Sequence, residues 1–509
     1  MILIWLILIL FIGGVAAWLA GGVNSKAPRV VALITVLIDL LLFLSYCSGL
    51  DLSTAINAGD LAGSNVWIVQ FMAPWIPQFG INFLFAMDGV TLTLNLLTLF
   101  LGVVAIFAAW SEIDQKTGFF YFNLLWVLAG VIGVFTALDL FLFFFFWEVM
   151  LIPMYLLIAV WGHEKKEYAA LKFFIFTQVS GLLMLLSILA LVSINYQQTG
   201  VISFSYMDLL GTQTDSDVGM WIMLGFFVAF VVKLPGVPLH NWLPDAHTQA
   251  PTAGSVILAG VLLKTGAYGL LRFIFPLFPE AATAFAPIAM TLGVISVLYG
   301  AKLAFAQYDM KRLIAYTSIS HMGFILIGVF AWNTLALQGA VMQMLAHGVS
   351  SAALFALAGG LQHRLHTRDL REMGGFWTIV PRTGAIALFF LIAALGLPGL
   401  GNFVGESMVL FGAFIASPTV AVFATIGVIF APVYALKVAQ DAFQGETNSR
   451  FDVSGKLTDL APHELLMMGS MIAVLVVMGL YPQPLIDTLA PAIDSMHQLA
   501  QAQISVIGR

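Results

Sequence analysis

The sequence contains very little charge and almost no cysteine. Only 9% of its 509 residues are charged and 61% are hydrophobic, whereas soluble domains carry about a quarter charged residues. This composition excludes a soluble enzyme. The single cysteine, Cys47, lies in an apolar run, so a disulfide framework and a thiolate cluster for iron–sulfur or zinc are also excluded. We therefore expect no redox cofactor and no metal on this chain.

Basic clusters and targeting signals are missing as well. No group of lysines and arginines is dense enough to indicate a nucleic-acid partner. The amino-terminal segment 1–22 is apolar from its second residue and lacks the basic start and polar cleavage region of a secretory signal. We interpret it as the first membrane helix, retained in the mature protein.

Long hydrophobic runs fill the rest of the chain. A run of roughly 20 apolar residues crosses a bilayer as a helix, and the longest polar connections, 50–82 and 195–218, are only loop-sized. We predict an all-α, polytopic membrane protein of about fourteen spans that forms a single membrane domain over 1–509. The predicted spans are 2–20, 29–49, 84–109, 118–136, 138–161, 170–194, 219–248, 253–277, 282–305, 312–331, 334–361, 376–416, 418–444 and 463–481.

Lysine and arginine collect in the connections between spans 1–2, 3–4, 5–6, 9–10, 11–12 and 13–14. Because such residues stay on the cytoplasmic side, their alternation fixes the orientation, and an even number of spans places both termini on the outer side. The connections 50–82 and 195–218 contain none of them. The basic connections contain Lys26, Arg29, Lys116, Lys165, Lys166, Lys172, Lys302, Lys311, Arg312, Arg364, Arg368, Arg371, Arg450 and Lys456.

Two predicted spans are interrupted by proline and glycine. The seventh and the twelfth both contain Leu-Pro-Gly, at 234–236 and 397–399. Proline removes an amide donor and glycine permits unusual dihedral angles, and broken backbone at membrane depth persists only where protein or water satisfies it. Ordinary kinks are the alternative, since both residues are common in membrane helices. The matched pair of interruptions favours two discontinuous helices.

The two interrupted spans lie five spans apart, which indicates an internal repeat. Discontinuous helices at corresponding positions of two repeats are the usual sign of a transport site, and an odd offset reverses the second copy in the membrane. We predict two inverted five-helix repeats, 118–277 (spans 4–8) and 282–444 (spans 9–13). The helices within 1–109 and 463–481 would flank them.

Six ionisable residues fall near the middle of the membrane, each on a different predicted span. A charge at that depth costs at least about 2.5–3.5 kcal/mol, so each residue needs a partner, a wet cavity or a function. The six residues are Glu148, Lys233, Lys264, His321, His347 and Glu406.

The chemistry of these six residues suits a proton relay. Burial lowers the pKa of a lysine and a nearby carboxylate raises it, so a lysine whose carboxylate partner approaches and withdraws carries protons. Glu148 with Lys233 is the natural pair, and Lys264 with His321 would pass the proton on, because imidazole titrates near neutrality. Glu406 would be the terminal acceptor. A static Glu148–Lys233 ion pair is the structural alternative.

The remaining titratable residues have weaker functional indications. A lone intramembrane histidine is often a satisfied core residue, which is the alternative for His347. We expect His240 and His247 to hydrogen-bond at the cytoplasmic edge, and the roles of Asp88 and Glu112 stay open. We expect a structural role for the other aspartates near helix ends or on flanking helices, namely Asp39, Asp139, Asp309 and Asp441.

Five segments around these residues resemble the antiporter-like membrane subunits of respiratory complex I. They are FFFFFWEVMLIPMYLLI, VVKLPGVPLHNWLPDAHTQAPTAGSVILAGVLLKTGAYGLLR, KRLIAYTSISHMGF, AHGVSSAALF and GLPGLGNFVGE. The resemblance runs over essentially the full length. Among the paralogues the chain is most similar to the M-type (subunit 4-like) chain of bacterial NADH–quinone oxidoreductase. Residue 406 is glutamate rather than lysine, and the long lateral helix of the L-type is absent.

This resemblance implies both a fold and a set of roles. It implies fourteen helices in two inverted repeats with discontinuous helices 7 and 12. It also implies that Glu148 and Lys233 form a functional ion pair. In the same way, Lys264, His321 and His347 would form the central relay, and Glu406 the exit residue.

The resemblance further implies a proton-translocating subunit of a translocase (EC 7.1.1 type) that couples quinone reduction elsewhere to outward proton pumping. FMN, the iron–sulfur clusters and quinone would be bound by partner subunits. The partners would be other membrane-arm subunits, including paralogous antiporter-like chains, together with lipid. The chain would be a multi-pass protein of the bacterial inner (plasma) membrane with both termini on the periplasmic side.

Two other functions remain open at this point. The same helices would suit a subunit of a multisubunit cation/proton antiporter or of a membrane-bound hydrogenase. A purely structural scaffold, whose buried charges only fix helix packing, is the alternative from a different class.

Overall fold

The protein is a bundle of membrane-spanning helices. The computed structural model describes residues 1–49, 67–446 and 458–507, and in this part of the chain thirteen helices are long and apolar enough to cross a membrane. This confirms a mostly helical, multi-pass membrane protein. The thirteen are α1 (Ile2–Ala20), α2 (Ala27–Ser48), α4 (Gly89–Ala108), α5 (Thr117–Thr136), α6 (Leu140–Trp161), α7 (Lys166–Thr199), α9 (Ser216–Lys233), the segment Thr252–Leu277, α14 (Pro279–Phe305), α15 (Met310–Phe330), α16 (Thr334–Leu365), Pro418–Phe443 and α21 (Pro462–Leu480).

The remaining predicted span, 376–416, is the one that proline and glycine interrupt. It is divided into α18 (Pro381–Ala394) and α19 (Gly401–Ala416). Two glycines in the connection, Gly396 and Gly399, have φ angles of 77° and 94°, which residues with a side chain rarely adopt. The predicted discontinuous helix is therefore present.

The seventh predicted span is broken in the same way. Helix α9 ends at Lys233, and α10 (Trp242–Gln249) begins after a non-helical turn. The indole N–H of Trp242 donates to the carbonyl oxygen of Val232 at 2.8 Å, so a backbone acceptor near the break keeps a partner. Lys233 is the last residue of α9, where the helix dipole favours a positive charge.

The eighth span is continuous but not a regular α-helix. It consists of α11 (Thr252–Ile257), the π-type turn η2 (Leu258–Leu262), α12 (Leu263–Gly269), a second π-type turn η3 (Leu270–Ile274) and α13 (Phe275–Leu277). Every residue of this span is buried. The two wide turns flank the helical segment that carries Lys264, and such turns are frequent at functional sites.

Two elements at one end of the bundle were not predicted. A β-hairpin of β1 (Val69–Ile76), η1 (Pro77–Phe79) and β2 (Ile81–Met87) precedes α4, where we expected a loop and an earlier start of the third span. The run of apolar residues in β2 continues directly into α4, which hid the boundary. After the last span, α22 (Gln483–Ile507) packs against the same end.

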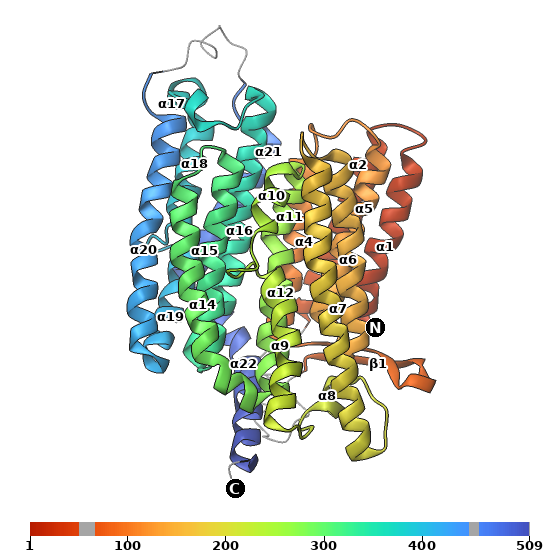
Figure 1. The fold of residues 1–509 in the computed structure, drawn as a ribbon. Helices are drawn as coiled ribbons and strands as arrows, with labels where there is room; N and C mark the ends of the chain where they lie inside the picture. The colour runs from red at the N-terminus through yellow and green to blue at the C-terminus, as the bar shows by residue number, and fades with distance from the viewer. Residues whose placement is uncertain (50–66, 447–457, 508–509) are drawn as a thin grey trace.

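We call this end of the bundle, with β1, β2 and α22, the hairpin end, and the opposite end, with Lys26, Lys165 and Arg364, the basic end. Both chain termini point to the hairpin end (Figure 1). The remaining short elements are α8 (Tyr206–Leu209), η4 (Leu370–Glu372) and α17 (Phe376–Ile379). The span Pro418–Phe443 consists of α20 (Pro418–Val438) and the π-type turn η5 (Ala439–Phe443).

The middle of the bundle is formed by the Thr252–Leu277 segment together with α15 and α16, which are almost wholly buried. The outer helices α1, α2, α20 and α21 instead expose large apolar side chains such as Ile12, Leu41 and Ile429. An apolar outer surface is what contact with hydrocarbon requires, and it leaves the interior for polar groups.

Glycines set the distance between α16 and α19. A Cβ atom added at Gly412 would lie 2.5 Å from the Cβ of Ala336, and one added at Gly339 would lie 2.7 Å from the Cβ of Met408. Small residues allow this close approach of two membrane helices. The spacing matters because α19 carries Glu406 and α16 carries His347.

We predict that Gly412→Val destabilises the detergent-purified protein by on the order of 1–3 kcal/mol, because the added methyl groups separate α16 from α19. The thermal unfolding midpoint measures the effect. Gly469→Val is the matched control, since a Cβ atom there meets no atom within 4 Å. Equal unfolding midpoints for the two variants would contradict this account of the packing.

Candidate functional site

Four of the six predicted residues form a continuous buried row. The ammonium Nζ of Lys264 lies 2.8 Å from Nδ1 of His347. The ring centroids of His347 and His321 are 5.3 Å apart, and Nδ1 of His321 lies 2.8 Å from Oε1 of Glu406. All four side chains are buried. They come from α12, α16, α15 and α19, so the row crosses the bundle from the eighth predicted span to the twelfth.

Two further residues complete the Glu406 end of the row. The amide Nε2 of Gln343 donates to Oε1 of Glu406 at 2.9 Å, and the hydroxyl of Tyr434 lies 3.4 Å from Nε2 of His321. Sequence reasoning missed both, since it considered only groups that titrate in a useful range. One signal was available: Gln343 precedes His347 by four residues, which places both on one face of α16.

The predicted Glu148–Lys233 pair is not in direct contact. Neither Oε1 of Glu148 nor Nζ of Lys233 has a hydrogen-bond partner among the described residues. The ammonium instead lies 4.9 Å from the ring centroid of Trp147, which provides a cation–π contact. The two charges are near enough to influence each other electrostatically. Lys233 is buried, whereas Glu148 is only half-buried and has a side-chain hydrogen bond with Gln178. A buried ammonium without a hydrogen-bond partner is a site for water or for movement.

Lys233 is connected to the row through backbone packing rather than through a hydrogen bond. A Cβ atom added at Gly266 would lie 3.1 Å from the Cβ of Lys233, and Gly266 is two residues from Lys264 on the same helix. The break after α9 therefore lies directly against α12. Any change of the break alters the surroundings of the central lysine.

The row continues towards the basic end through His247. Its imidazole stacks on the Phe355 ring with the centroids 4.3 Å apart, and neither ring nitrogen has a protein hydrogen-bond partner in the described part of the chain. Our expectation of a hydrogen-bonding role at the cytoplasmic edge is therefore wrong for His247. The side chain is instead a fully buried imidazole near the charges of Lys264 and Lys311.

A second imidazole lies at the basic end, outside the membrane-spanning helices. Nε2 of His163 lies 3.5 Å from Nζ of Lys311. The same ammonium group donates to the carbonyl oxygen of Ala250 at 3.2 Å. Burial, together with the nearby charges of Lys311 and Arg368, lowers the pKa of His163 to about 3. The imidazole is therefore neutral near pH 7 and accepts from the lysine.

Asp88 and Glu112, whose roles the sequence leaves open, both accept hydrogen bonds from backbone N–H groups at the start of a helix. Glu112 accepts from the backbone N–H of Thr252 at 3.1 and 3.2 Å, where α11 begins. Asp88 accepts from the backbone N–H of Thr91 at 2.9 Å and also pairs with Arg272. Carboxylates are favourable at helix amino termini because free N–H groups point at them.

Two of the aspartates that we expected to be structural cap helices in the same way. Asp139 caps α6 and Asp309 caps α15. Asp39 is different, because it is fully buried and neither of its carboxylate oxygens has a protein partner among the described residues.

The arrangement can pass protons but offers no obvious metal site. Hydrogen-bond contacts of 2.8 Å join Lys264 to His347 and His321 to Glu406, and imidazole both accepts and donates a proton. No group of three histidine, cysteine or acidic side chains in the described residues is placed to hold a metal ion. Two broken helices beside buried ionisable side chains are the construction of a secondary ion transporter.

Comparison with known proteins identifies the family. The family described as NADH:quinone oxidoreductase/Mrp antiporter, TM, matches residues 137–431. Subunit M of NADH-quinone oxidoreductase from Escherichia coli is 53% identical over 503 residues, which cover 98% of both chains. The same subunit from Pseudomonas aeruginosa is 52% identical and covers 100% of this chain and 99% of its own. The chain therefore belongs to this family of antiporter-like membrane subunits.

Solved structures agree with this assignment. A chain of respiratory complex I from Thermus thermophilus with bound NADH superimposes with a TM-score of 0.86 and 30% identity, covering 98% of this chain and 100% of its own. A chain of the Mrp complex from Dietzia sp. has the same fold at 20% identity and a TM-score of 0.80, and 52% of that chain is covered.

We predict that Gln343→Leu lowers the stability of the protein by about 1–3 kcal/mol, because the substitution leaves the buried Glu406 carboxylate without its amide donor. Gln338→Leu, on the same helix but outside the row, is the control. Thermal unfolding of both purified variants measures the difference. A Gln343→Leu protein as stable as the control would mean that this hydrogen bond does not support the row.

Proposed function

We propose that this chain is the M-type, proton-translocating membrane subunit of a bacterial NADH–quinone oxidoreductase. The observation that carries the proposal is the buried row Lys264–His347–His321–Glu406, held by four helices at hydrogen-bond and ring-contact distances. Leaving charged groups inside a membrane protein is costly, and such groups are retained mainly for ion or proton pathways. Full-length identity of 53% to subunit M of Escherichia coli supports the assignment to complex I.

The proposed mechanism is a stepwise transfer between neighbouring side chains. Protons would reach Lys264 from the basic end and from Lys233, whose charge depends on how near the Glu148 carboxylate lies. From Lys264 the proton would pass to His347 and His321 and then to Glu406. Movement of Glu148 towards or away from Lys233 would start each cycle, because a nearby carboxylate stabilises the charged ammonium. Water would fill the gap between these two side chains.

Redox chemistry would be confined to partner subunits. One cysteine cannot supply the four thiolates that an iron–sulfur cluster requires, so FMN, the clusters and quinone would be bound elsewhere in the assembly. The partners would be other membrane-arm subunits, including paralogous antiporter-like chains. As part of this assembly the chain belongs to a translocase, although no electron passes through it.

We further propose an orientation and a repeat. The chain would lie in the inner membrane with the basic end in the cytoplasm and both termini in the periplasm, in agreement with the distribution of lysine and arginine. Residues 118–277 and 282–444 would form the two inverted repeats. The interruptions after Lys233 and after Ala394 would be the corresponding broken helices.

A subunit of a multisubunit cation/proton antiporter is the second candidate. The Mrp chain supports only a common fold at 20% identity. A scaffold without proton transfer is the third candidate. It does not account for Lys233, since a buried charge that only joined helices would be paired directly.

We predict that Lys233→Ala abolishes or strongly reduces proton pumping by the complex reconstituted in liposomes, because Lys264 loses the neighbouring lysine that would supply it with protons. NADH:quinone reductase activity and assembly are measured on the same preparation. Glu167→Gln, which neutralises an exposed carboxylate at the start of α7, is the control. Full pumping by an assembled Lys233→Ala complex would favour the scaffold.

A further inference from the structure

The segment Thr252–Leu277 carries a polar stripe that begins at Lys264 and extends beyond the relay. Lys264, Tyr268 and Arg272 follow one another at intervals of four residues, so they lie on one face and lead from the middle of the membrane towards the hairpin end. All three are buried. Each interval of four residues advances about 6 Å along a helix. The stripe therefore spans about 12 Å from the central lysine outwards.

Helix α4 presents a second polar stripe to the first. Asp88 at its amino terminus pairs with Arg272, and the Tyr268 hydroxyl lies beside Thr91. Because the two helices run in opposite directions, the next turn of α4, with Asn95, reaches the depth of Lys264. The α4 stripe therefore consists of Asp88, Thr91 and Asn95, and all three side chains are buried.

Several polar atoms between these stripes lack a protein partner. Within the described residues, neither the oxygen nor the nitrogen of the Asn95 amide has a hydrogen-bond partner, whereas the hydroxyls of Thr91 and Tyr268 interact with each other. Nε of Arg272 and the hydroxyl of Tyr206 are also without one. Buried polar atoms are nearly always satisfied by protein or by water. A column of such atoms is a site for ordered water.

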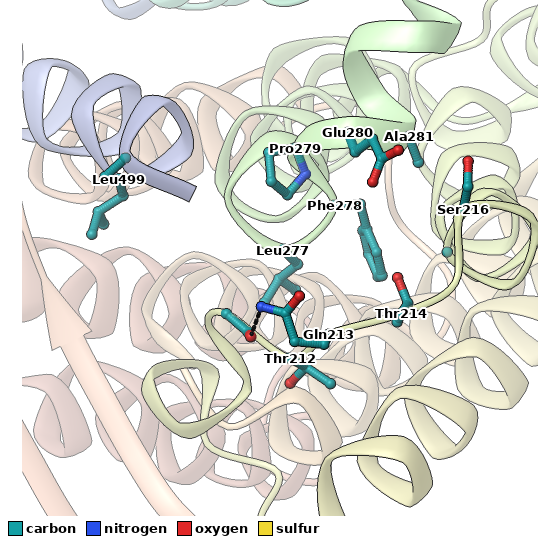
Figure 2. A pocket seen from close by; sticks show the side chains of 13 residues that line it. Thr212, Gln213, Thr214, Ser216, Leu277, Phe278, Pro279, Glu280, Ala281 and Leu499 are labelled. Atoms are coloured by element: carbon teal, nitrogen blue, oxygen red, sulfur yellow. Dashed lines mark hydrogen bonds between the residues drawn. The ribbon is translucent and has the colours of Figure 1, made fainter. Parts of the chain in front are cut away.

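The outer end of this column meets one cavity, which adjoins a second. The smaller, of about 70 Å³, is lined by Arg272, Tyr206, Trp67 and residues of α22 that include Ser495. The larger, of about 350 Å³, shares Leu499 with it. Figure 2 shows this second cavity between Thr212–Ser216, the start of α14 with Glu280, and Leu499 of α22. Both volumes exceed what one water molecule needs.

From this continuity we propose that the interface of α4 and α12–η3 is a second proton outlet, which leads from Lys264 to the hairpin end and is gated by the Arg272–Asp88 pair. The inference rests on the proposed function. Asn95, Thr91 and Tyr268 would hold a chain of water molecules, and proton exchange along it needs no net movement of heavy atoms. Glu406 would then not be the sole exit.

The ion pair acts as a barrier because of the Arg272 guanidinium. A fixed positive charge in a narrow polar pathway repels hydrated protons, and the Asp88 carboxylate holds it across the column. A purely structural ion pair would account for Asp88 and Arg272 but not for the two unpartnered amide atoms of Asn95 at the inner end. The two Asn95 amide atoms favour a proton pathway over a purely structural ion pair.

The test uses the whole complex in liposomes. Asn95→Leu and Thr91→Val should each lower the number of protons pumped per quinone reduced without loss of assembly, and Thr91→Val removes little more than a hydroxyl. Asn123→Leu on α5 and Thr93→Val on α4 are the matched controls, since both are buried outside the column. Unchanged stoichiometry in an assembled Thr91→Val complex would overturn the outlet.

A second measurement tests the gate. Arg272→Gln should increase passive proton leak severalfold when a potassium diffusion potential is imposed, and adding Asn95→Leu or Thr91→Val should suppress that leak. A leak that neither second substitution suppresses, or no leak in the assembled Arg272→Gln complex, would overturn the gate. If Lys233→Ala also left pumping intact, the proposed function itself would fail, which is a different outcome from failure of the outlet alone.

Discussion

The structure depends on the cost of keeping a charge inside hydrocarbon. A lysine or carboxylate at mid-membrane costs several kcal/mol unless protein or water surrounds it, so the outer helices are apolar and the polar groups converge on the middle of the bundle. Lys264, His347, His321 and Glu406 satisfy one another there. Glu148 and Lys233 do not. The four residues of the row therefore have fixed partners, whereas the distance between Glu148 and Lys233 is free to change.

The irregular backbone follows from the same constraint. A regular helix uses all of its backbone groups internally, whereas the break after Lys233 and the connection from Leu395 to Leu400 release some of them beside the charged side chains. The wide turns η2 and η3 lie on either side of Lys264 in the most buried helix. Irregular backbone at this depth is stable only where it lines protein or water. The places where the helices are least regular are therefore the places where the ionisable groups lie.

Most of the helices and their interruptions could be predicted from the sequence, because the position of a residue along its helix largely determines its depth in the membrane. Hydropathy gave the spans, and the Leu-Pro-Gly pairs gave both interruptions. What could not be predicted depends on helix rotation: that His321 contacts Glu406, that Glu148 stays apart from Lys233, and that the Asn95 amide is buried without a protein partner among the described residues. Gln343 and Asn95 are neutral amides, which a search for charges passes over. The hairpin before α4 was hidden because its second strand is as apolar as the helix that follows.

The central claim is that buried charges exchange protons through water as well as directly. A cryo-EM map of the assembled complex, at a resolution that shows ordered water, tests it most directly. The account predicts water molecules between Glu148 and Lys233 and between Lys233 and Lys264, continuous with the row that ends at Glu406. Gaps closed by apolar side chains, with no water between these groups, would contradict it.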